Sequence, residues 1–365
     1  MNAAGPAASR IRVLIADDSA VMRTALSRAV DSAGTMMVCG TARNGLEALE
    51  KIRQMRPDVV TLDVEMPALN GLDVLRQIMK EFPRPVIMVG SLTQRGAETT
   101  LEALDIGAFD YLAKDEGGPV TDPDRVLREL IEKIEAAARS PLGRTHSLPA
   151  AALQPPVFLR SPLEGLHSTP EVFVIGTSTG GPKALQEILP RLPGDFPVGI
   201  IVVQHMPAGF TAPLAKRLDS LCKLRVLEGT DGATLGPGII FIAPAGKHLT
   251  VSRESPRHST ITLSDDPPGT LHKPAVDVTM LSVAKAFGRH AAGVILTGMG
   301  TDGMLGMTAI RKAGGTTIGQ DEATSAVYGM PRCCAESGVL QSIVPLSGIA
   351  GEILLATKYR AREKG

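Results

Sequence analysis

The sequence predicts two α/β domains, each built around a parallel β-sheet, that are joined by a linker. At about 150 residues per domain, a chain of 365 residues has the length of two domains. Short apolar runs alternate with amphipathic stretches in both halves, a pattern typical of strands buried between layers of helices. Between the halves, proline, serine and glycine recur without an apolar rhythm. We therefore expect a first domain at 10–138, a linker at 139–170 and a second domain at 171–357.

The first domain is expected to be doubly wound, with five β-α units. Its strands are visible as apolar runs, and amphipathic stretches suit the helices that cover the sheet. A last helix at 122–139 begins with Asp122 and Pro123, a good N-cap followed by proline at the first helical position. Examples of the apolar runs are 11–16, 58–62, 85–89 and 109–113, and the amphipathic stretches include 21–33 and 43–55.

The second domain shows the same α/β pattern, without a fixed sequence repeat. Its continuous apolar runs again suit strands that are buried on both faces of a parallel sheet. A helix is expected at 303–313. The apolar runs are 171–176, 198–203, 238–243, 293–297 and 316–319.

Composition argues against several classes of function. The 38 basic and 38 acidic side chains give a formal net charge of zero, unlike a protein that binds nucleic acid or an anionic membrane. No apolar run approaches the roughly 20 residues of a membrane-spanning helix, and the first residues do not resemble a signal sequence. The four cysteines are too scattered for a disulfide framework. We expect a soluble cytoplasmic protein with no nucleic-acid partner and no membrane insertion.

Three strands of the first domain end in charged residues. Asp17 and Asp18 follow the run 11–16, Asp63 follows a second strand and Lys114 a third. The carboxyl ends of parallel strands meet at one edge of a sheet, so these side chains are expected to converge. Carboxylates suit Mg²⁺, and Asp63 is then placed to attack a phosphoryl group while Mg²⁺ and Lys114 neutralise the developing charge. Taken singly, each aspartate suits a helix cap equally well, but the whole set favours phosphotransfer.

These residues lie in motifs that resemble the receiver domain of response regulators. The motifs are IADDS at 15–19, LDVEMPALNGLD at 62–73 and YLAK at 111–114. The resemblance implies a flavodoxin-like domain that needs Mg²⁺ for its phosphorylation by a histidine kinase. It also implies roles for five positions: Asp63 as phosphoacceptor, Asp17 and Asp18 as the acidic pair at the metal, the backbone carbonyl of Glu65 as a further metal ligand, and Lys114 as the phosphate-binding lysine.

The sequence departs from the receiver pattern at two positions. Gly90 stands where the family places a serine or threonine, and it is followed by Ser91. Asp115 stands where proline usually follows the lysine. We expect Ser91 to substitute for the missing hydroxyl as a phosphate-binding group, or backbone N–H groups to serve alone with weaker coupling.

The second domain opens with GTSTGGP at 176–182, between a strand and a helical pattern. A GxSxG sequence in this context predicts a nucleophile elbow, in which a strained turn exposes the hydroxyl of Ser178. A glycine-rich turn can also cradle a phosphate, and on the loop alone the two interpretations are equal. However, the GxGxxG spacing is absent, and the second strand ends in Gln204 and His205 rather than in an acidic residue.

A histidine and an aspartate follow two further strands. His205 comes directly after the strand GIIVVQ at 199–204, and Asp302 lies in the loop after the run 293–297. In isolation, Asp302 suits the cap of the next helix. Together with Ser178, these residues supply a nucleophile, a base and an orienting carboxylate from three strand ends. Their order in the chain, Ser-His-Asp, differs from the Ser-Asp-His order of α/β-hydrolases.

The second domain resembles the catalytic domain of the CheB family of chemotaxis protein-glutamate methylesterases. The resemblance implies that Ser178, His205 and Asp302 form a catalytic triad, and that backbone N–H groups of Thr179 and Met299 bind the oxyanion. A receiver joined to such a domain by a linker is also the architecture of that family. The matching segments are IGTSTGGPKAL at 175–185, VQHMPAGF at 203–210, IAPAGKH at 242–248, ILTGMGTDG at 295–303 and GQDEATSAVYGMPR at 319–332.

The resemblance implies a serine hydrolase, activated by phosphorylation, that demethylates glutamate γ-methyl esters and deamidates glutamines on chemoreceptors. The esterase reaction is expected to need no cofactor, and the unphosphorylated receiver is expected to inhibit it. The alternative is a non-catalytic, receiver-regulated protein whose glycine-rich loop binds a nucleotide. His248 and His272 could line the substrate cleft, but we expect them to be packed or surface residues.

Overall fold

The structure is a computed structural model that describes residues 10–91, 94–114, 123–140, 168–255 and 258–359. The described residues form two compact units, divided between residues 153 and 154. This division falls inside the segment 139–170 that the sequence analysis assigns to a linker. Within the described ranges, no helix is both long enough and apolar enough to cross a membrane.

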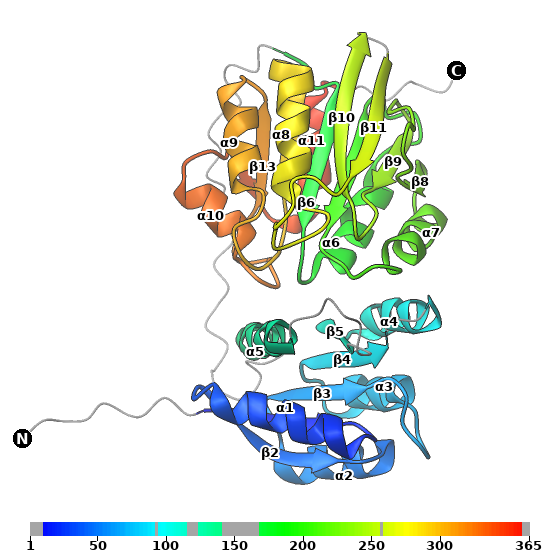
Figure 1. Cartoon of the computed structure of the whole chain (residues 1–365), viewed down its shortest axis with the longest axis vertical. Helices are drawn as coiled ribbons and strands as arrows, with labels where there is room; N and C mark the ends of the chain where they lie inside the picture. Colours follow the sequence, from blue (N-terminus) through cyan, green and yellow to red (C-terminus); the bar gives the residue numbers. More distant parts are fainter. Residues whose placement is uncertain (1–9, 92–93, 115–122, 141–167, 256–257, 360–365) are drawn as a thin grey trace, which may run out of the picture. The chain divides into compact units, whose positions relative to one another are not determined.

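The first unit is the doubly wound α/β fold that the sequence predicts. Its five described strands form one parallel sheet in the order β2-β1-β3-β4-β5, with helices on both faces (Figure 1). The strands are β1 (Ile11–Ala16), β2 (Met36–Ala42), β3 (Val59–Asp63), β4 (Val86–Ser91) and β5 (Asp110–Lys114). The helices are α1 (Ala20–Ser32), α2 (Gly45–Met55), α3 (Gly71–Glu81), α4 (Gln94–Ile106) and α5 (Pro123–Arg139).

Local sequence signals explain where these helices begin. Ser19 caps α1 by accepting a hydrogen bond from the Met22 N–H, and Asn44 and Asn70 cap α2 and α3 in the same way. Leu26 of α1 and Leu130 of α5 share one core with strands β1, β3 and β4. Helix α5 covers the predicted segment from Pro123 onward, whereas the expected N-cap Asp122 lies outside the described residues.

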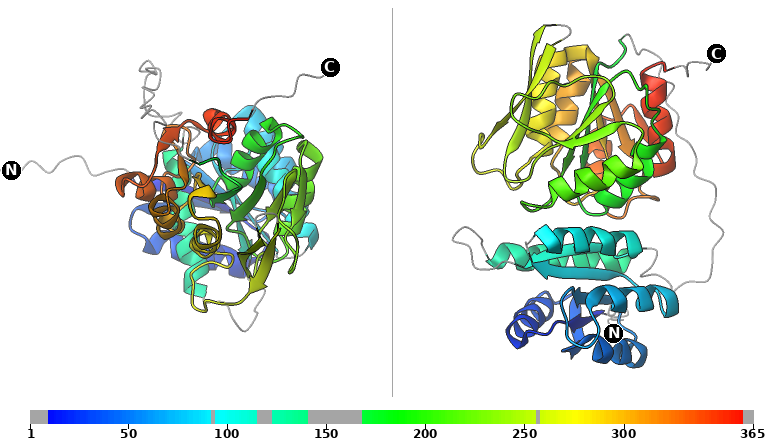
Figure 2. Two further views of the ribbon diagram at one scale, coloured as in Figure 1. Left: turned by 90° about the horizontal axis from the view of Figure 1, so that it is seen from above. Right: turned by 90° about the vertical axis from the view of Figure 1, so that its right-hand side faces the viewer.

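The second unit contains a larger parallel sheet and a separate hairpin (Figure 2). Its strands are β6 (Val172–Thr177), β7 (Gly199–Gln204), β8 (Arg225–Glu228), β9 (Ile239–Ile242), β10 (His248–Ser255), β11 (His258–Ser264), β12 (Ala291–Ile295), β13 (Thr316–Gln320) and β14 (Ser342–Val344). Its helices are α6 (Gly181–Ile188), α7 (Thr211–Leu221), α8 (Val276–Phe287), α9 (Met304–Lys312), α10 (Met330–Glu336) and α11 (Leu346–Ala356), with short 3₁₀ turns at Leu189–Arg191 and Gly288–His290.

The seven described strands of the large sheet run in the order β14-β13-β12-β6-β7-β9-β8, all parallel. This confirms the predicted parallel-sheet fold. Because β6 comes first in the chain, the strands added later extend the sheet from it in both directions. In doubly wound sheets, ligands bind at the carboxyl ends of the strands where the strand order reverses, which here is the boundary between β6 and β12.

The antiparallel hairpin of β10 and β11 does not appear among the predicted strands. Its residues alternate between apolar and polar, unlike the continuous apolar runs of the central sheet. One face packs on α8, where the Thr279 hydroxyl donates to the Leu249 carbonyl and the Ser282 hydroxyl accepts from the Val251 N–H. The hairpin therefore covers α8 and carries His248 at its start.

Helices α8 and α9 pack closely because Gly306 has no side chain. A Cβ added at this position would overlap the Cβ of Met280 on α8. The packed pair supports the carboxyl end of β12 and the loop that follows it, since α8 also contacts β6 and β12.

This contact predicts that Gly306→Ala destabilises the protein by about 1–3 kcal/mol, because the two helices must separate to admit the methyl group. Gly351→Ala is the matched control. It lies in α11 with nothing within 4 Å of an added Cβ, and it should be neutral or stabilising by up to about 1 kcal/mol. Urea unfolding followed by circular dichroism measures both effects. Equal stabilities for the two variants would contradict the close packing.

Candidate active site

Ser178 lies in the turn between β6 and α6, at the edge where the strand order reverses. Its N–H donates to the Thr297 carbonyl at 3.1 Å, and its own carbonyl accepts from the Gly181 N–H at 2.8 Å. The positive φ of this turn falls on a glycine and not on Ser178 itself. Gly180 takes the left-handed conformation of the turn, with φ 78°, whereas the described non-glycine residues with positive φ are Arg56, Ala68 and Lys358.

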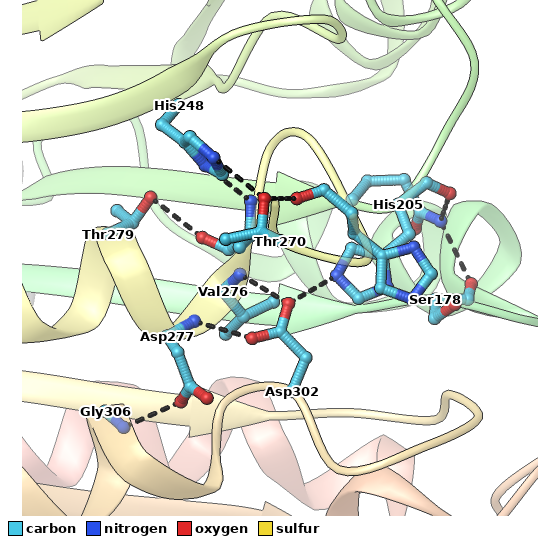
Figure 3. A network of polar contacts seen from close by, with 12 residues as sticks. Ser178, His205, His248, Thr270, Val276, Asp277, Thr279, Asp302 and Gly306 are labelled. Atoms are coloured by element: carbon cyan, nitrogen blue, oxygen red, sulfur yellow. Dashed lines mark hydrogen bonds and ion pairs between the residues drawn. The ribbon is translucent and has the colours of Figure 1, made fainter. Parts of the chain in front are cut away.

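His205 and Asp302 are hydrogen-bonded to each other. The Nε2 atom of His205 lies 2.8 Å from Oδ2 of Asp302, and the two side chains are 6% and 17% exposed (Figure 3). The His205 N–H donates to the Thr177 carbonyl at 3.1 Å, which places the histidine beside the turn of Ser178. Within the described part of the chain, the buried Nδ1 atom of His205 has no hydrogen-bond partner. This nitrogen is therefore available to a neighbouring hydroxyl or substrate.

Asp302 is held at the start of α8 and does not cap α9. Its Oδ2 accepts from the Val276 N–H at 2.7 Å, and its Oδ1 accepts from the Asp277 N–H at 2.9 Å. Helix α9 has Gly303 as its N-cap, without a side-chain cap bond. Burial opposes ionisation of Asp302, but the hydrogen bonds from His205 and from the two backbone groups outweigh it and lower the pKa of the carboxyl. Asp302 is thus an ionised partner for the imidazole.

Asp277 makes the reciprocal contact with α9. Its Oδ1 accepts from the Gly306 N–H at 2.8 Å (Figure 3). Burial is the main cause that raises the pKa of Asp277. The start of α8 thus bonds Asp302, which precedes α9, and the start of α9 bonds Asp277, which lies in α8. This arrangement is favourable because helix N-termini carry unpaired N–H groups and positive charge. The exchange fixes the position of Asp302, and no motif in the sequence predicts it.

Gln204 is a second residue that the sequence analysis missed as part of the site. Its Nε2 donates to the carbonyls of Ser178 and His205, each at 3.0 Å, and the residue is 1% exposed. One buried amide therefore ties the backbone of the serine to that of the histidine. The signal in the sequence is a polar residue that ends an otherwise apolar strand.

The loop after β12 passes directly against Ser178. A Cβ added at Gly298 would lie 2.8 Å from the Ser178 Cβ and 3.0 Å from its backbone nitrogen, so only glycine fits there. Met299 follows Gly298 in this loop, and Thr179 follows Ser178 in its own turn. The Thr297 hydroxyl donates to the Thr179 carbonyl at 3.0 Å and holds that side of the turn.

Two further histidines lie near the site. His248 is fully buried, as expected of a packed residue. The imidazole of His272 stacks on that of His205, with ring centroids 3.9 Å apart and an angle of 15° between the planes. His272 therefore lies in contact with His205 and is more than the packed or surface residue that we expected.

A second cluster lies at the carboxyl edge of the sheet in the first unit. Carboxylate oxygens of Asp17, Asp18 and Asp63 lie within 4.8 Å of one another. The Lys114 Nζ is 2.6 Å from Asp63 Oδ2 and 3.0 Å from Asp17 Oδ2. The Glu65 N–H donates to Asp63 Oδ1 at 3.3 Å. The donor set of three carboxylates, two of them buried, suits a hard divalent cation.

Burial dominates the electrostatics of Asp63. It raises the pKa of this carboxyl to about 6, against the lowering effect of Lys114, and the nearby charge of Asp17 adds to the rise. Burial would by itself lower the pKa of Lys114, but its contacts with Asp63 and Asp17 raise it. The lysine is therefore a permanent positive charge beside the carboxylates.

Arg23 supports the acidic pair from α1. Its Nη1 donates to the carbonyls of both Asp17 and Asp18 at 2.8 Å, which fixes the turn that carries them. No sequence motif singled out this arginine.

The positions at which the sequence departs from the receiver pattern lie at the same edge. Gly90 is buried, and a Cβ there would lie 3.1 Å from the Val64 Cγ2. The backbone of Ser91 pairs with Lys114, but its side chain and Asp115 lie outside the described residues. The phosphate-binding role of Ser91 therefore stays a prediction.

Comparisons with known proteins agree with this division into two units. The sequence model of the CheB methylesterase family matches residues 173–353, and that of the response regulator receiver domain matches residues 13–120. The crystal structure of the Thermotoga maritima CheB methylesterase catalytic domain is 39% identical, with a TM-score of 0.50, and covers 52% of this chain and 99% of that domain.

Curated relatives extend over nearly the whole chain. The protein-glutamate methylesterase/protein-glutamine glutaminase 1 of Oleidesulfovibrio alaskensis is 44% identical over 95% of this chain and 99% of the relative. The protein of the same name from Geobacter sulfurreducens is 43% identical over 94% and 97%. The chain therefore belongs to the CheB methylesterase family, with a response regulator receiver domain ahead of the methylesterase domain.

Proposed function

We propose that the protein is a phosphorylation-activated serine hydrolase that demethylates glutamate γ-methyl esters and deamidates glutamines on chemoreceptors. The hydrogen bond between His205 and Asp302, beside the turn of Ser178, carries the proposal. The names of the relatives supply the substrate class. A cytoplasmic location is part of the proposal, in keeping with four cysteines that are all free.

The proposed reaction is acyl transfer. Because Asp302 accepts from Nε2–H of His205, the lone pair of Nδ1 is left to act as the base. Nδ1 takes the proton of the Ser178 hydroxyl as its oxygen attacks the side-chain carbonyl, and then gives that proton to the leaving methanol or ammonia. Water attacks the acyl-enzyme in the same manner and releases glutamate. Nothing in this sequence of steps requires a cofactor.

The backbone N–H groups of Thr179 and Met299 are proposed to bind the oxyanion. Thr179 follows Ser178 in the turn, and Met299 follows Gly298, whose backbone lies close to the serine. The alternative function, nucleotide binding by the glycine-rich loop, has no specific observation in its favour. The second strand ends in Gln204, which is engaged with the carbonyls of Ser178 and His205.

The first unit is proposed to accept a phosphoryl group on Asp63 from a histidine kinase. Asp17, Asp18 and Asp63, with the Glu65 carbonyl, would hold Mg²⁺, which supplies positive charge between an anionic phosphodonor and an anionic carboxylate. Lys114 would bind a phosphoryl oxygen, since its ammonium already lies 2.6 Å from Asp63. Arg23 would keep the turn of the acidic pair in place.

Removal of the nucleophile or the base should abolish the hydrolase activity. Ser178→Ala and His205→Ala should each lower kcat by at least roughly a thousandfold, because the two groups act as a unit. Asp302→Ala should cost less, since this carboxylate orients the imidazole without taking its proton. Methanol release from a methylated receptor measures the effect, with Ser220→Ala as a control at an exposed serine. Near-normal turnover in Ser178→Ala would end the serine mechanism.

Mg²⁺ binding should weaken as the pH falls through about 6, where Asp63 becomes protonated and can no longer serve as a charged ligand. Affinity should therefore be higher at pH 7–8 than at pH 5. Calorimetric titration of the full chain at several pH values measures this dependence. The Asp63→Asn variant should bind the ion more weakly and lose most of the dependence in this range. An equally steep profile in that variant would contradict the assignment.

Phosphorylation should raise the esterase activity through Asp63. Asp63→Asn should keep a low basal rate that does not respond to a small phosphodonor, whereas a chain without residues 1–140 should have a higher basal rate. Gly90→Ser should strengthen the response if the missing hydroxyl limits it, since only the Val64 methyl must move to admit the new Cβ. Methanol release with and without phosphodonor tests all three. A truncated chain no faster than the unphosphorylated protein would contradict inhibition by the receiver.

A further inference from the structure

The face of the His205 imidazole is covered by a second imidazole. The rings of His205 and His272 are nearly parallel, 15° apart, with centroids separated by 3.9 Å. At this distance the rings are in van der Waals contact, so each restricts the rotation of the other. At its edge, His205 is restrained by the bond from Nε2 to Asp302, while the described residues offer Nδ1 no partner. One hydrogen bond lets a ring swing about the bonded atom, and the stacked ring opposes that swing.

The loop that carries His272 is fixed at both ends. The Lys273 carbonyl accepts from the Gly246 N–H at 3.0 Å, and the His272 carbonyl accepts from the Thr270 hydroxyl at 3.0 Å. Beyond them, the Ala275 N–H donates to Nδ1 of the buried His248 at 3.2 Å. His272 thus lies on a loop that is tied to the hairpin of β10 and β11 on one side and leads into α8 on the other.

The direction of each bond in this network follows from donor chemistry. A backbone N–H can only donate, so Nδ1 of His248 carries no proton and Nε2 carries it. Nε2–H then donates to the Thr270 Oγ1 at 3.1 Å (Figure 3). The Thr270 hydroxyl in turn donates to the His272 carbonyl. Burial, with the charge of Lys273, lowers the pKa of His248 and keeps this ring neutral. The chain of bonds runs from the core of the unit to the residue stacked on His205.

We propose that His272 is a positioning residue, which holds the plane of the His205 ring by stacking so that Nε2 stays on Asp302 and Nδ1 stays available to Ser178. The inference rests on the proposed function, because it assigns His205 as the base. His272 transfers no proton in this role. Its contribution is geometric, and misplacement of a reacting group by about 1 Å costs roughly a hundredfold in rate.

Replacement of the ring tests the role of stacking. In the full-length protein, His272→Ala should lower kcat roughly tenfold to a hundredfold with KM within about twofold, because the reacting geometry loosens while substrate contacts remain. His272→Phe keeps an aromatic face without a titratable group and should recover most of kcat. His258→Ala is the control, since His258 is a half-exposed histidine on β11. Methanol release from a methylated receptor gives both kinetic constants.

Two further measurements separate the role of His272 from an effect on folding and from the proposed function. Thr270→Val removes the tether but leaves both rings in the chain, and should lower kcat in the same direction as His272→Ala with little added loss in the double variant. The ¹⁵N chemical shifts of the His205 imidazole, read without substrate, should report an altered hydrogen bond to Asp302 in His272→Ala and a near-native one in His272→Phe.

Three results would overturn the inference. The first is a native kcat in His272→Ala. The second is a His272→Phe variant as slow as His272→Ala, which would point to proton transfer by the histidine. The third is a Thr270→Val variant with native kcat. Loss of activity in Ser178→Ala alongside any of these would leave the proposed function standing. Activity retained in Ser178→Ala would instead refute the proposed function itself.

Discussion

Three donors converge on one carboxylate in the second unit. The Nε2–H of His205 and the backbone N–H groups of Val276 and Asp277 all bond the side chain of Asp302. The two backbone donors belong to the first turn of α8. The position of this helix start therefore depends on the position of the Asp302 carboxylate. The same carboxylate orients the imidazole. The stability of the α8–α9 pair and the geometry of the site therefore depend on one set of hydrogen bonds.

Both units carry their candidate site at the carboxyl edge of a parallel sheet, but the two sites differ in their electrostatics. In the first, Asp17, Asp18 and Asp63 gather negative charge that Lys114 only partly offsets, and burial raises the pKa of Asp63. Such a site attracts a divalent cation, whose charge would then let an anionic phosphoryl donor approach Asp63. In the second, the charge of Asp302 is balanced by helix N–H groups and by one imidazole. That site is suited to proton transfer rather than to metal binding.

Residues at strand ends could be predicted from the sequence, because a buried apolar run has a readable end and parallel strands share an edge. Residues that depend on tertiary packing could not. The link from Gln204 to two carbonyls, the stack of His272 on His205 and the carboxylate exchange between Asp302 and Asp277 join positions that are distant in sequence or have no motif. The hairpin of β10 and β11 was missed for a related reason, since its alternating pattern differs from the continuous runs of the central strands.

The exchange of carboxylates between α8 and α9 also determines how the second unit opens. The first turn of a helix usually frays before its centre, because its N–H groups lack partners within the helix. Here the leading N–H groups of α8 bond Asp302, and the Gly306 N–H of α9 bonds Asp277. If the first turn of α8 frays, Asp302 loses its backbone donors. If the first turn of α9 frays, Asp277 loses the Gly306 N–H. Amide hydrogens in both first turns should thus exchange with solvent together, in a single opening that also disassembles the site around His205.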